Sequence, residues 1–164
     1  MEIGLAAEPP RVELPDGLQL RTYADADAEP LRAAINEAFR DDPFHVEVTP
    51  GSFREFFLRS RGFDPALWLL AWDGGDLAGF SLAYPEHGSD ASLGWVGTLG
   101  IREPWRRRGL GEALLRRSFA ELYGRGLRRV GLGVDAQNVT GALRLYERAG
   151  MRQVHRSDNW QKAV

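Results

Sequence analysis

An α/β fold with one mixed sheet is predicted by three features of the chain. Residues 67–72 and 77–84 are two apolar runs, and the glycines between them can adopt the positive φ that a tight hairpin requires. A third apolar run, residues 93–101, is followed by an amphipathic helix and then by a strand with alternating apolar residues. A strand, a crossover helix and a second strand form a parallel unit. The sheet is therefore expected to combine antiparallel and parallel pairs.

The chain before the hairpin predicts one strand and two helices. Residues 18–22 alternate apolar and polar side chains, as a half-buried strand does. Asp25 or Asp27 offers the start of a helix whose apolar residues recur with helical spacing. Residues 41–43 end that helix, and Thr49 offers the start of a second, shorter one.

Three glycines interrupt the strand predicted at residues 93–101: Gly94, Gly97 and Gly100. Glycine in a strand costs stability, and it often marks a bulge or a place where another group approaches the backbone closely. Both features suit a strand that binds a ligand.

The rest of the chain completes the order of elements. The helix after this strand ends at Gly124, and residues 130–134 form the parallel strand. A further helix closes at Gly150 with a left-handed C-terminal cap. Residues 151–155 and 159–164 are expected as a last antiparallel pair. The predicted order is β-α-α-β-β-β-α-β-α-β-β.

A phosphate-binding turn is predicted where the glycine-containing strand ends. Arg106, Arg107 and Arg108 lead to Gly109 and Gly111 at the start of the next helix. The free amides and the positive dipole end of a helix N-terminus favour an anion, and guanidinium groups strengthen that field. A P-loop is excluded because no lysine follows the glycines, and a dinucleotide fingerprint lacks its third glycine. A diphosphate fits such a turn.

A second motif lies further along the chain and contains Asn138, Gly141 and the pair Leu145-Tyr146. Together with the arginine and glycine turn, in this order, it resembles the two signatures of the GNAT N-acetyltransferases, which bind acyl-coenzyme A. The segments look closest to mycothiol-synthase-like GNAT domains of actinobacteria. The resemblance covers residues 17–164, and residues 1–16 are expected to be a polar N-terminal lead.

The resemblance implies how acetyl-coenzyme A binds. In this family strands four and five, here residues 93–101 and 130–134, splay apart, and the pantetheine arm bonds to the backbone of strand four. The amides of the arginine and glycine turn hold the diphosphate, and Asn138 bonds the pantetheine or the turn around it. The cofactor-binding residues implied are Leu99, Gly100, Ile101, Arg106, Arg107, Arg108, Gly109, Leu110, Gly111, Glu112 and Asn138.

The resemblance also implies direct attack of an amine on the thioester in a ternary complex, with Tyr146 as the catalytic residue that protonates the leaving thiolate. An aromatic residue on an amphipathic helix is more often part of the core, so Tyr146 has a structural interpretation as well. The same holds for the three arginines, because arginines often pair with nearby acids such as Glu103 and Glu112.

The general base stays open. Many family members carry a glutamate on strand four at the position of Trp95. Histidines in loops are most often exposed residues without a role in catalysis, and an amine with a low pKa needs no base at pH 7. The alternatives, besides a water chain, are Asp42, His45, Glu47, Glu86 and His87.

Composition limits the partners. The formal net charge of −2 argues against a general nucleic-acid binder, and no apolar run reaches the ~18 residues that span a bilayer. The chain has no cysteine, which excludes disulfides and catalysis by its own thiolate, and no metal site is predicted. No secretory leader is recognised, so a cytoplasmic location is the expectation.

A small amine is the expected acceptor, and the N-terminal amine of a protein is the alternative. A non-catalytic acyl-coenzyme A sensor is an alternative from a different functional class, motivated by the tryptophan in place of the glutamate. The sequence leaves open whether the chain is a monomer or a homodimer.

Overall fold

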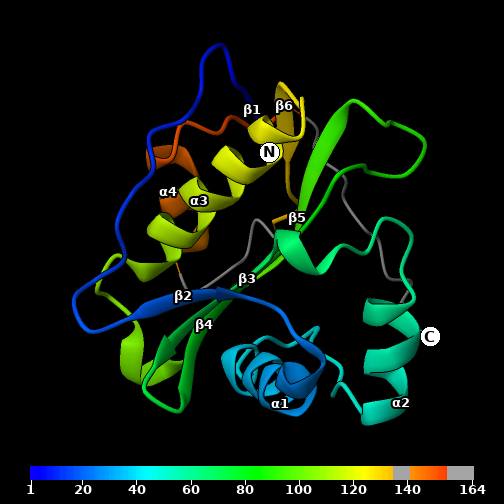
Figure 1. The fold of residues 1–164 in the computed structure, drawn as a ribbon, viewed down its shortest axis with the longest axis vertical. Coiled ribbons are helices and arrows are strands. Elements are labelled where there is room, and N and C mark those ends of the chain that lie inside the picture. The colour runs from blue at the N-terminus through cyan, green and yellow to red at the C-terminus, as the bar shows by residue number, and fades with distance from the viewer. Residues whose placement is uncertain (135–140, 155–164) are drawn as a thin grey trace.

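A mixed sheet with helices on both faces organises the molecule (Figure 1). The computed structural model describes residues 1–134 and 141–154. The strands in these residues are β1 Glu2–Gly4, β2 Gln19–Thr22, β3 Trp68–Asp73, β4 Asp76–Tyr84, β5 Leu93–Ile101 and β6 Arg129–Gly131. The helices are α1 Ala28–Ala38, α2 Pro50–Phe53, α3 Leu110–Gly124 and α4 Ala142–Arg148. The strands lie in the order β1-β6-β5-β4-β3-β2.

The predicted α/β class and its central elements are confirmed. β3 and β4 form the predicted hairpin, which closes at the pair Asp73–Asp76 with Gly74 at a φ of 59°. β5 pairs with β6 in parallel, as the strand, helix and strand unit requires. The helix between them ends at Gly124, as predicted. The second short helix begins after Thr49 and continues as a π-helical turn, Arg54–Leu58.

The N-terminus differs from the polar lead that the sequence predicts. β1 pairs antiparallel with β6, and the backbone carbonyl of Met1 accepts a hydrogen bond from Leu132 (2.9 Å). Met1 and Leu5 are buried, and Ile3 packs against the same core. The physical reason is a short alternation of apolar residues: Met1, Ile3 and Leu5 all pack against one core. The strand is too short for this alternation to stand out from the sequence.

The last predicted strand pair falls largely on residues outside the described ranges. Within those ranges, Arg152 makes an isolated antiparallel bridge with Glu2, so the chain after α4 returns to the edge formed by β1. Residues 159–164 lie outside the part of the chain that the structure describes.

The two faces of the sheet carry separate cores (Figure 1). α1 packs on β4 through Leu31 and Ile35, which share a cluster with Trp68 and Phe80. α3 packs on the opposite face, where Phe119 joins residues of β5, β6 and α4. A group that approaches the middle of the sheet therefore meets α1 and α2 from one side and α3 and α4 from the other.

β5 contains a bulge at one of its three glycines. Leu82 pairs with Thr98 and Ala83 with Val96, which leaves Gly97 without a partner in the ladder to β4. A Cβ on Gly97 would lie 2.8 Å from the ring of Tyr84, so a larger residue does not fit there. The predicted bulge is thus present, and it changes the direction of β5 in the middle of the sheet.

The predicted splay of β5 and β6 is confirmed in the described residues. Their ladder ends at the pair Trp95–Gly131, immediately before the bulge. Beyond this pair the edge of β5 that faces away from β4 has no neighbour on β6.

Candidate active site

The open edge of β5 presents the backbone groups of Leu99 and Ile101. Arg102 donates its amide to Ala78 of β4 (2.9 Å), and Gly100 pairs with Phe80. In an antiparallel pair the backbone groups of alternate residues point to opposite sides, so the residues between them face away from β4. The edge that the sequence predicts for pantetheine is therefore directed into the gap between the splayed strands.

The turn between β5 and α3 has the backbone geometry of an anion site. Arg107 and Gly109 adopt left-handed conformations, with φ of 62° and 81°. The first amide of α3 that bonds back to this turn is that of Ala113, which donates to the carbonyl of Gly109 (3.1 Å). The amides before Ala113 are therefore not used by the helix. These amides, together with the exposed Arg107 and Arg108, can hold a diphosphate.

Arg106 takes a different place from its two neighbours. Its Nε donates to the carbonyl of Ile101 (3.0 Å), and one terminal nitrogen donates to the carbonyl of Ala38 at the end of α1 (2.9 Å). The guanidinium thus connects β5 with α1 and is half-buried, whereas Arg107 and Arg108 are exposed.

Gly111 and Glu112 are used for packing at the start of α3. A Cβ on Gly111 would lie 2.9 Å from Leu145, so this glycine lets α4 approach α3. The Glu112 carboxylate accepts hydrogen bonds from Arg116 (3.0 Å) and Arg148 (3.5 Å). The expected pairing of Glu112 with the arginine turn is therefore replaced by pairing within α3 and to α4, which partly neutralises a negative charge beside the anion site.

Tyr146 lies on α4, on the same face of the sheet as α3. Its side chain is 9% exposed and packs in the cluster that contains Val96 of β5 and Leu132 after β6. Burial raises the pKa of the Tyr146 phenol above its ordinary value, so the group keeps its proton at neutral pH. The position of Tyr146 in the core is compatible with its expected role as a proton donor beside the splayed strands. Asn138 lies outside the described residues.

Trp95 stands where the sequence comparison with the family expects a glutamate. Its ring stacks on His87 with centroids 3.5 Å apart and also covers Gly131 of β6. Glu86 is bound by Arg61, with a distance of 2.8 Å from Nε to Oε1. The carboxylate of Glu86, the neighbour of His87 in the sequence, is therefore engaged in an ion pair.

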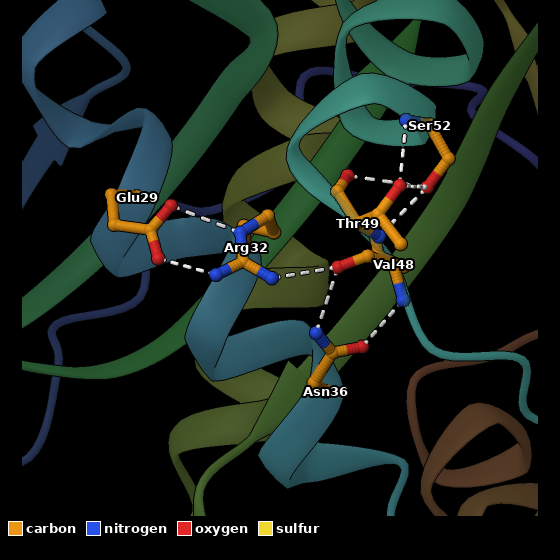
Figure 2. Close-up of polar contacts among 6 residues, drawn as sticks. All are labelled: Glu29, Arg32, Asn36, Val48, Thr49 and Ser52. Atoms are coloured by element: carbon orange, nitrogen blue, oxygen red, sulfur yellow. Dashed lines mark hydrogen bonds and ion pairs between the residues drawn. The ribbon is translucent and has the colours of Figure 1, made fainter.

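The loop from α1 to α2, residues 39–49, is held by side chains of α1 (Figure 2). Asn36 donates to the carbonyl of Val48 (3.0 Å) and accepts from its amide (2.8 Å). Arg32 donates to the same carbonyl (2.8 Å) and also binds Glu29. Sequence reasoning missed this clamp, because its only signal was an asparagine and an arginine at helical spacing on α1.

Comparisons with known proteins agree with this geometry. A family model described as "Acetyltransferase (GNAT) family" matches residues 31–151. A curated relative from Thermobispora bispora, named mycothiol acetyltransferase, is 38% identical over 149 residues, which cover 86% of this chain and 48% of the relative. The chain belongs to the GNAT acetyltransferase family, whose cosubstrate is acetyl-coenzyme A.

Solved structures show the same fold. A GCN5-related N-acetyltransferase from Sphaerobacter thermophilus superposes with a TM-score of 0.77 at 40% identity, over 92% of this chain and 46% of that one. An aminoglycoside acetyltransferase from an uncultured soil metagenomic sample matches with a TM-score of 0.68 at 16% identity. This match covers 91% of this chain and 97% of that one. The chain spans about half the length of the curated relatives it matches. Within the described residues, no helix is long and apolar enough to cross a bilayer.

Proposed function

We propose that this chain transfers an acetyl group from acetyl-coenzyme A to the primary amine of a small molecule. The observation that carries the proposal is the open edge of β5, which has the anion-binding turn at its end and the protonated phenol of Tyr146 on one side. An acyl donor with an extended arm and a diphosphate fits these three features together.

Three parts of the chain account for the three parts of the donor. The backbone of Leu99 and Ile101 pairs with the pantetheine amides, as an added strand does, and the Ile101 carbonyl shares this role with its bond from Arg106 (3.0 Å). The turn that begins at Arg107 holds the diphosphate. A hollow between the N-terminal segment 12–15 and the start of α3, which Arg108 and Arg116 also line, accepts the nucleotide end.

Transfer then proceeds in a ternary complex without a covalent enzyme intermediate. The amine adds to the thioester carbonyl, and a backbone amide of β5 beyond the bulge stabilises the oxyanion. The adduct collapses with cleavage of the carbon–sulfur bond, and Tyr146 gives its proton to the thiolate. A chain without cysteine can perform this reaction, because no step of it needs a protein thiol.

The acceptor is proposed to be a small cationic amine. Exposed acids, Asp41, Asp42 and Glu47, lie on the loop between α1 and α2 and attract a positive charge. The name of the curated relatives, mycothiol acetyltransferase, also supports a small-molecule acceptor. Trp95 in place of the glutamate is the observation that favours the second candidate, a protein that binds acyl-coenzyme A without transfer.

Two measurements on the purified chain test the proposal. Thermal unfolding is followed with acetyl-coenzyme A, coenzyme A and ATP in separate titrations, since a ligand at a hundred times its Kd stabilises by about 2.7 kcal/mol. Both coenzymes are expected to raise Tm, and ATP is not. Release of free thiol from acetyl-coenzyme A is then measured with glucosamine, kanamycin, a primary alkylamine and an alanyl tripeptide. Binding without transfer to any amine would favour the sensor, and transfer to the tripeptide alone would favour a protein acceptor.

A further inference from the structure

One histidine on the loop from α1 to α2 is held in a defined orientation, unlike an exposed loop residue. His45 is half-buried, and its Nε2 lies 3.1 Å from Oδ1 of Asn36. Its ring stacks on Phe39, with centroids 6.1 Å apart and planes at 30°. The backbone amide of His45 also donates to the carbonyl of Asp42 (3.0 Å), which closes the turn that carries it.

The hydrogen bonds of Asn36 determine which nitrogen of this histidine carries the proton. The Asn36 amide nitrogen donates to the carbonyl of Val48, and its Oδ1 accepts from the amide of Val48, so the amide group cannot be flipped without losing both bonds (Figure 2). Oδ1 can only accept from His45, and Nε2 must therefore be the protonated nitrogen. Nδ1 of the neutral ring is left as a proton acceptor.

The histidine lies on the side of the sheet opposite Tyr146. Phe39 packs edge-on against Phe80, with centroids 6.4 Å apart. Phe80 pairs with Gly100 of β5, and a Cβ on Gly100 would overlap its ring. The His45 ring is thus linked through Phe39 and Phe80 to β5 at Gly100, three residues beyond the bulge glycine Gly97. α1 belongs to one core of the sheet and Tyr146 to the other.

We infer that His45 is the general base of the acetyl transfer and that Asn36 is its positioning residue, an assignment that rests on the proposed function. Nδ1 takes one proton from the ammonium form of the acceptor and later releases it to water. The free amine forms the carbon–nitrogen bond, the carbon–sulfur bond breaks, and the thiolate receives the proton of Tyr146. The second proton lost by the nitrogen restores the phenol. Proton acceptor and proton donor then come from opposite faces of the sheet.

The charged groups near this ring leave its lone pair free. On its own loop these are Arg40, Asp41, Asp42 and Glu47, all exposed, and Asp42 Oδ1 accepts from the amide of Phe44 (2.9 Å). On α1, Arg32 is bound to Glu29 and to the carbonyl of Val48. β4 contributes an uncharged phenylalanine. No ion pair reaches His45 within residues 1–134 and 141–154.

The test uses the amine with the highest kcat/KM in the panel above and compares His45→Gln with His87→Gln. For His45→Gln, kcat/KM at pH 7 is expected to fall at least about a hundredfold, and the loss should shrink at high pH because the amine deprotonates without help. His87→Gln should stay within about twofold of the parent chain, since no described contact of His87 beyond its stacking on Trp95 orients its ring. Equal rates for His45→Gln and the parent chain at pH 7 would overturn the assignment.

Asn36→Asp tests the positioning role while keeping the histidine. A carboxylate facing the Nε2 proton favours the imidazolium, so the acid limb of the kcat/KM profile should move to higher pH, and an unmoved limb counts against the role. Nitrogen-detected NMR of the chain without acceptor should show Nε2 protonated, and protonation at Nδ1 alone would overturn the inference whether or not an acceptor is known. If acetyl-coenzyme A binds but no amine reacts, both the proposed function and the assignment of His45 as general base are wrong. If His45→Gln keeps its turnover, only the assignment of His45 is wrong.

Discussion

The proposed donor side and the proposed acceptor side of the site are built in different ways. The donor side is a contiguous stretch of chain, from the open edge of β5 through the turn at Gly109 to the first amides of α3. The acceptor side, around the loop from α1 to α2, is shaped by side chains of α1 that reach the backbone of Val48 (Figure 2). A left-handed backbone conformation favours glycine, which can be recognised in the sequence, whereas contacts between distant residues have no comparable sequence pattern.

The largest effect is expected at the hydroxyl of Tyr146, the proposed proton donor. Tyr146→Phe removes the proton for the leaving thiolate and keeps the ring in the core, so kcat should fall about a hundred- to a thousandfold. The Kd of acetyl-coenzyme A should stay within about twofold, as for an interaction made only in the transition state. Steady-state kinetics and calorimetric titration measure the two quantities.

Tyr123→Phe is the matched control for this substitution. Tyr123 lies near the C-terminal end of α3, where its ring lies under the guanidinium of Arg128. This variant should keep the parent kcat.

Burial raises the pKa of Tyr146, so the phenol is protonated below its ordinary pKa of about 10, and the loss of its proton should lower kcat only above that pH. An alkaline decline near pH 8 that Tyr146→Phe abolishes would contradict the predicted direction.

The second effect separates Arg106, whose guanidinium binds backbone carbonyls, from the exposed Arg107. Arg106→Met leaves the carbonyls of Ile101 and Ala38 without their donor, and hydrogen bonds to a charged group are worth about 1.5–3 kcal/mol. A loss of that size in the free energy of unfolding is expected, measured by urea denaturation. Arg107→Met should change stability by less than about 0.5 kcal/mol, because its side chain is exposed.

Salt dependence distinguishes the same pair of variants in binding. If the Arg107 side chain faces the diphosphate, removing it should reduce the dependence of the acetyl-coenzyme A Kd on ionic strength. Arg106→Met should weaken binding without a change in that dependence, since its guanidinium is already bound to backbone carbonyls. A reduced salt dependence for Arg106→Met would place this arginine on the ligand, as the sequence motif alone suggests.

The sequence predicted the sheet well where the pattern is local. The hairpin at Gly74 and the bulge glycine at Gly97 follow from residues that are close together in the chain. The pairing of β1 with β6 was not predicted, because three residues are too few to show a clear period and their partner lies far away in the sequence. The same limit explains why residues 1–16 were expected outside the sheet.

The candidate site was predictable in its backbone and not in its side chains. The positive φ of Gly109 agrees with the motif in which the sequence placed it. Gly111 is a cofactor-binding residue by resemblance, and the structure adds a packing role that the sequence did not predict, since a Cβ there would lie 2.9 Å from Leu145 of α4. His45 was expected to be an exposed loop residue, and the structure holds it through Asn36, a contact that no local pattern announces.

The smallest effect tests whether the turn acts through its conformation. Gly109→Ala places a Cβ in a left-handed conformation, which costs roughly 1–2 kcal/mol, although the space around it is open. Gly126, at the other end of α3, has a φ of 88° and the same open surroundings. Both substitutions should therefore lower the free energy of unfolding by about 1 kcal/mol, after allowance for the reduced entropy of the unfolded chain.

Only Gly109→Ala should also raise the Kd of acetyl-coenzyme A, by about tenfold, because 1.4 kcal/mol of conformational cost in the turn opposes the arrangement of amides that holds the diphosphate. Gly124→Ala is the control for the exchange itself, since this glycine lies in the last turn of α3 with open space around it. It should leave the Kd unchanged and stabilise the fold by about 0.4–1 kcal/mol. Equal weakening of binding by Gly109→Ala and Gly126→Ala would mean that coenzyme binding responds to the stability of α3 as a whole. The proposed donor side would then not depend on the backbone conformation of the turn, and its distinction from an acceptor side built by side chains would be lost.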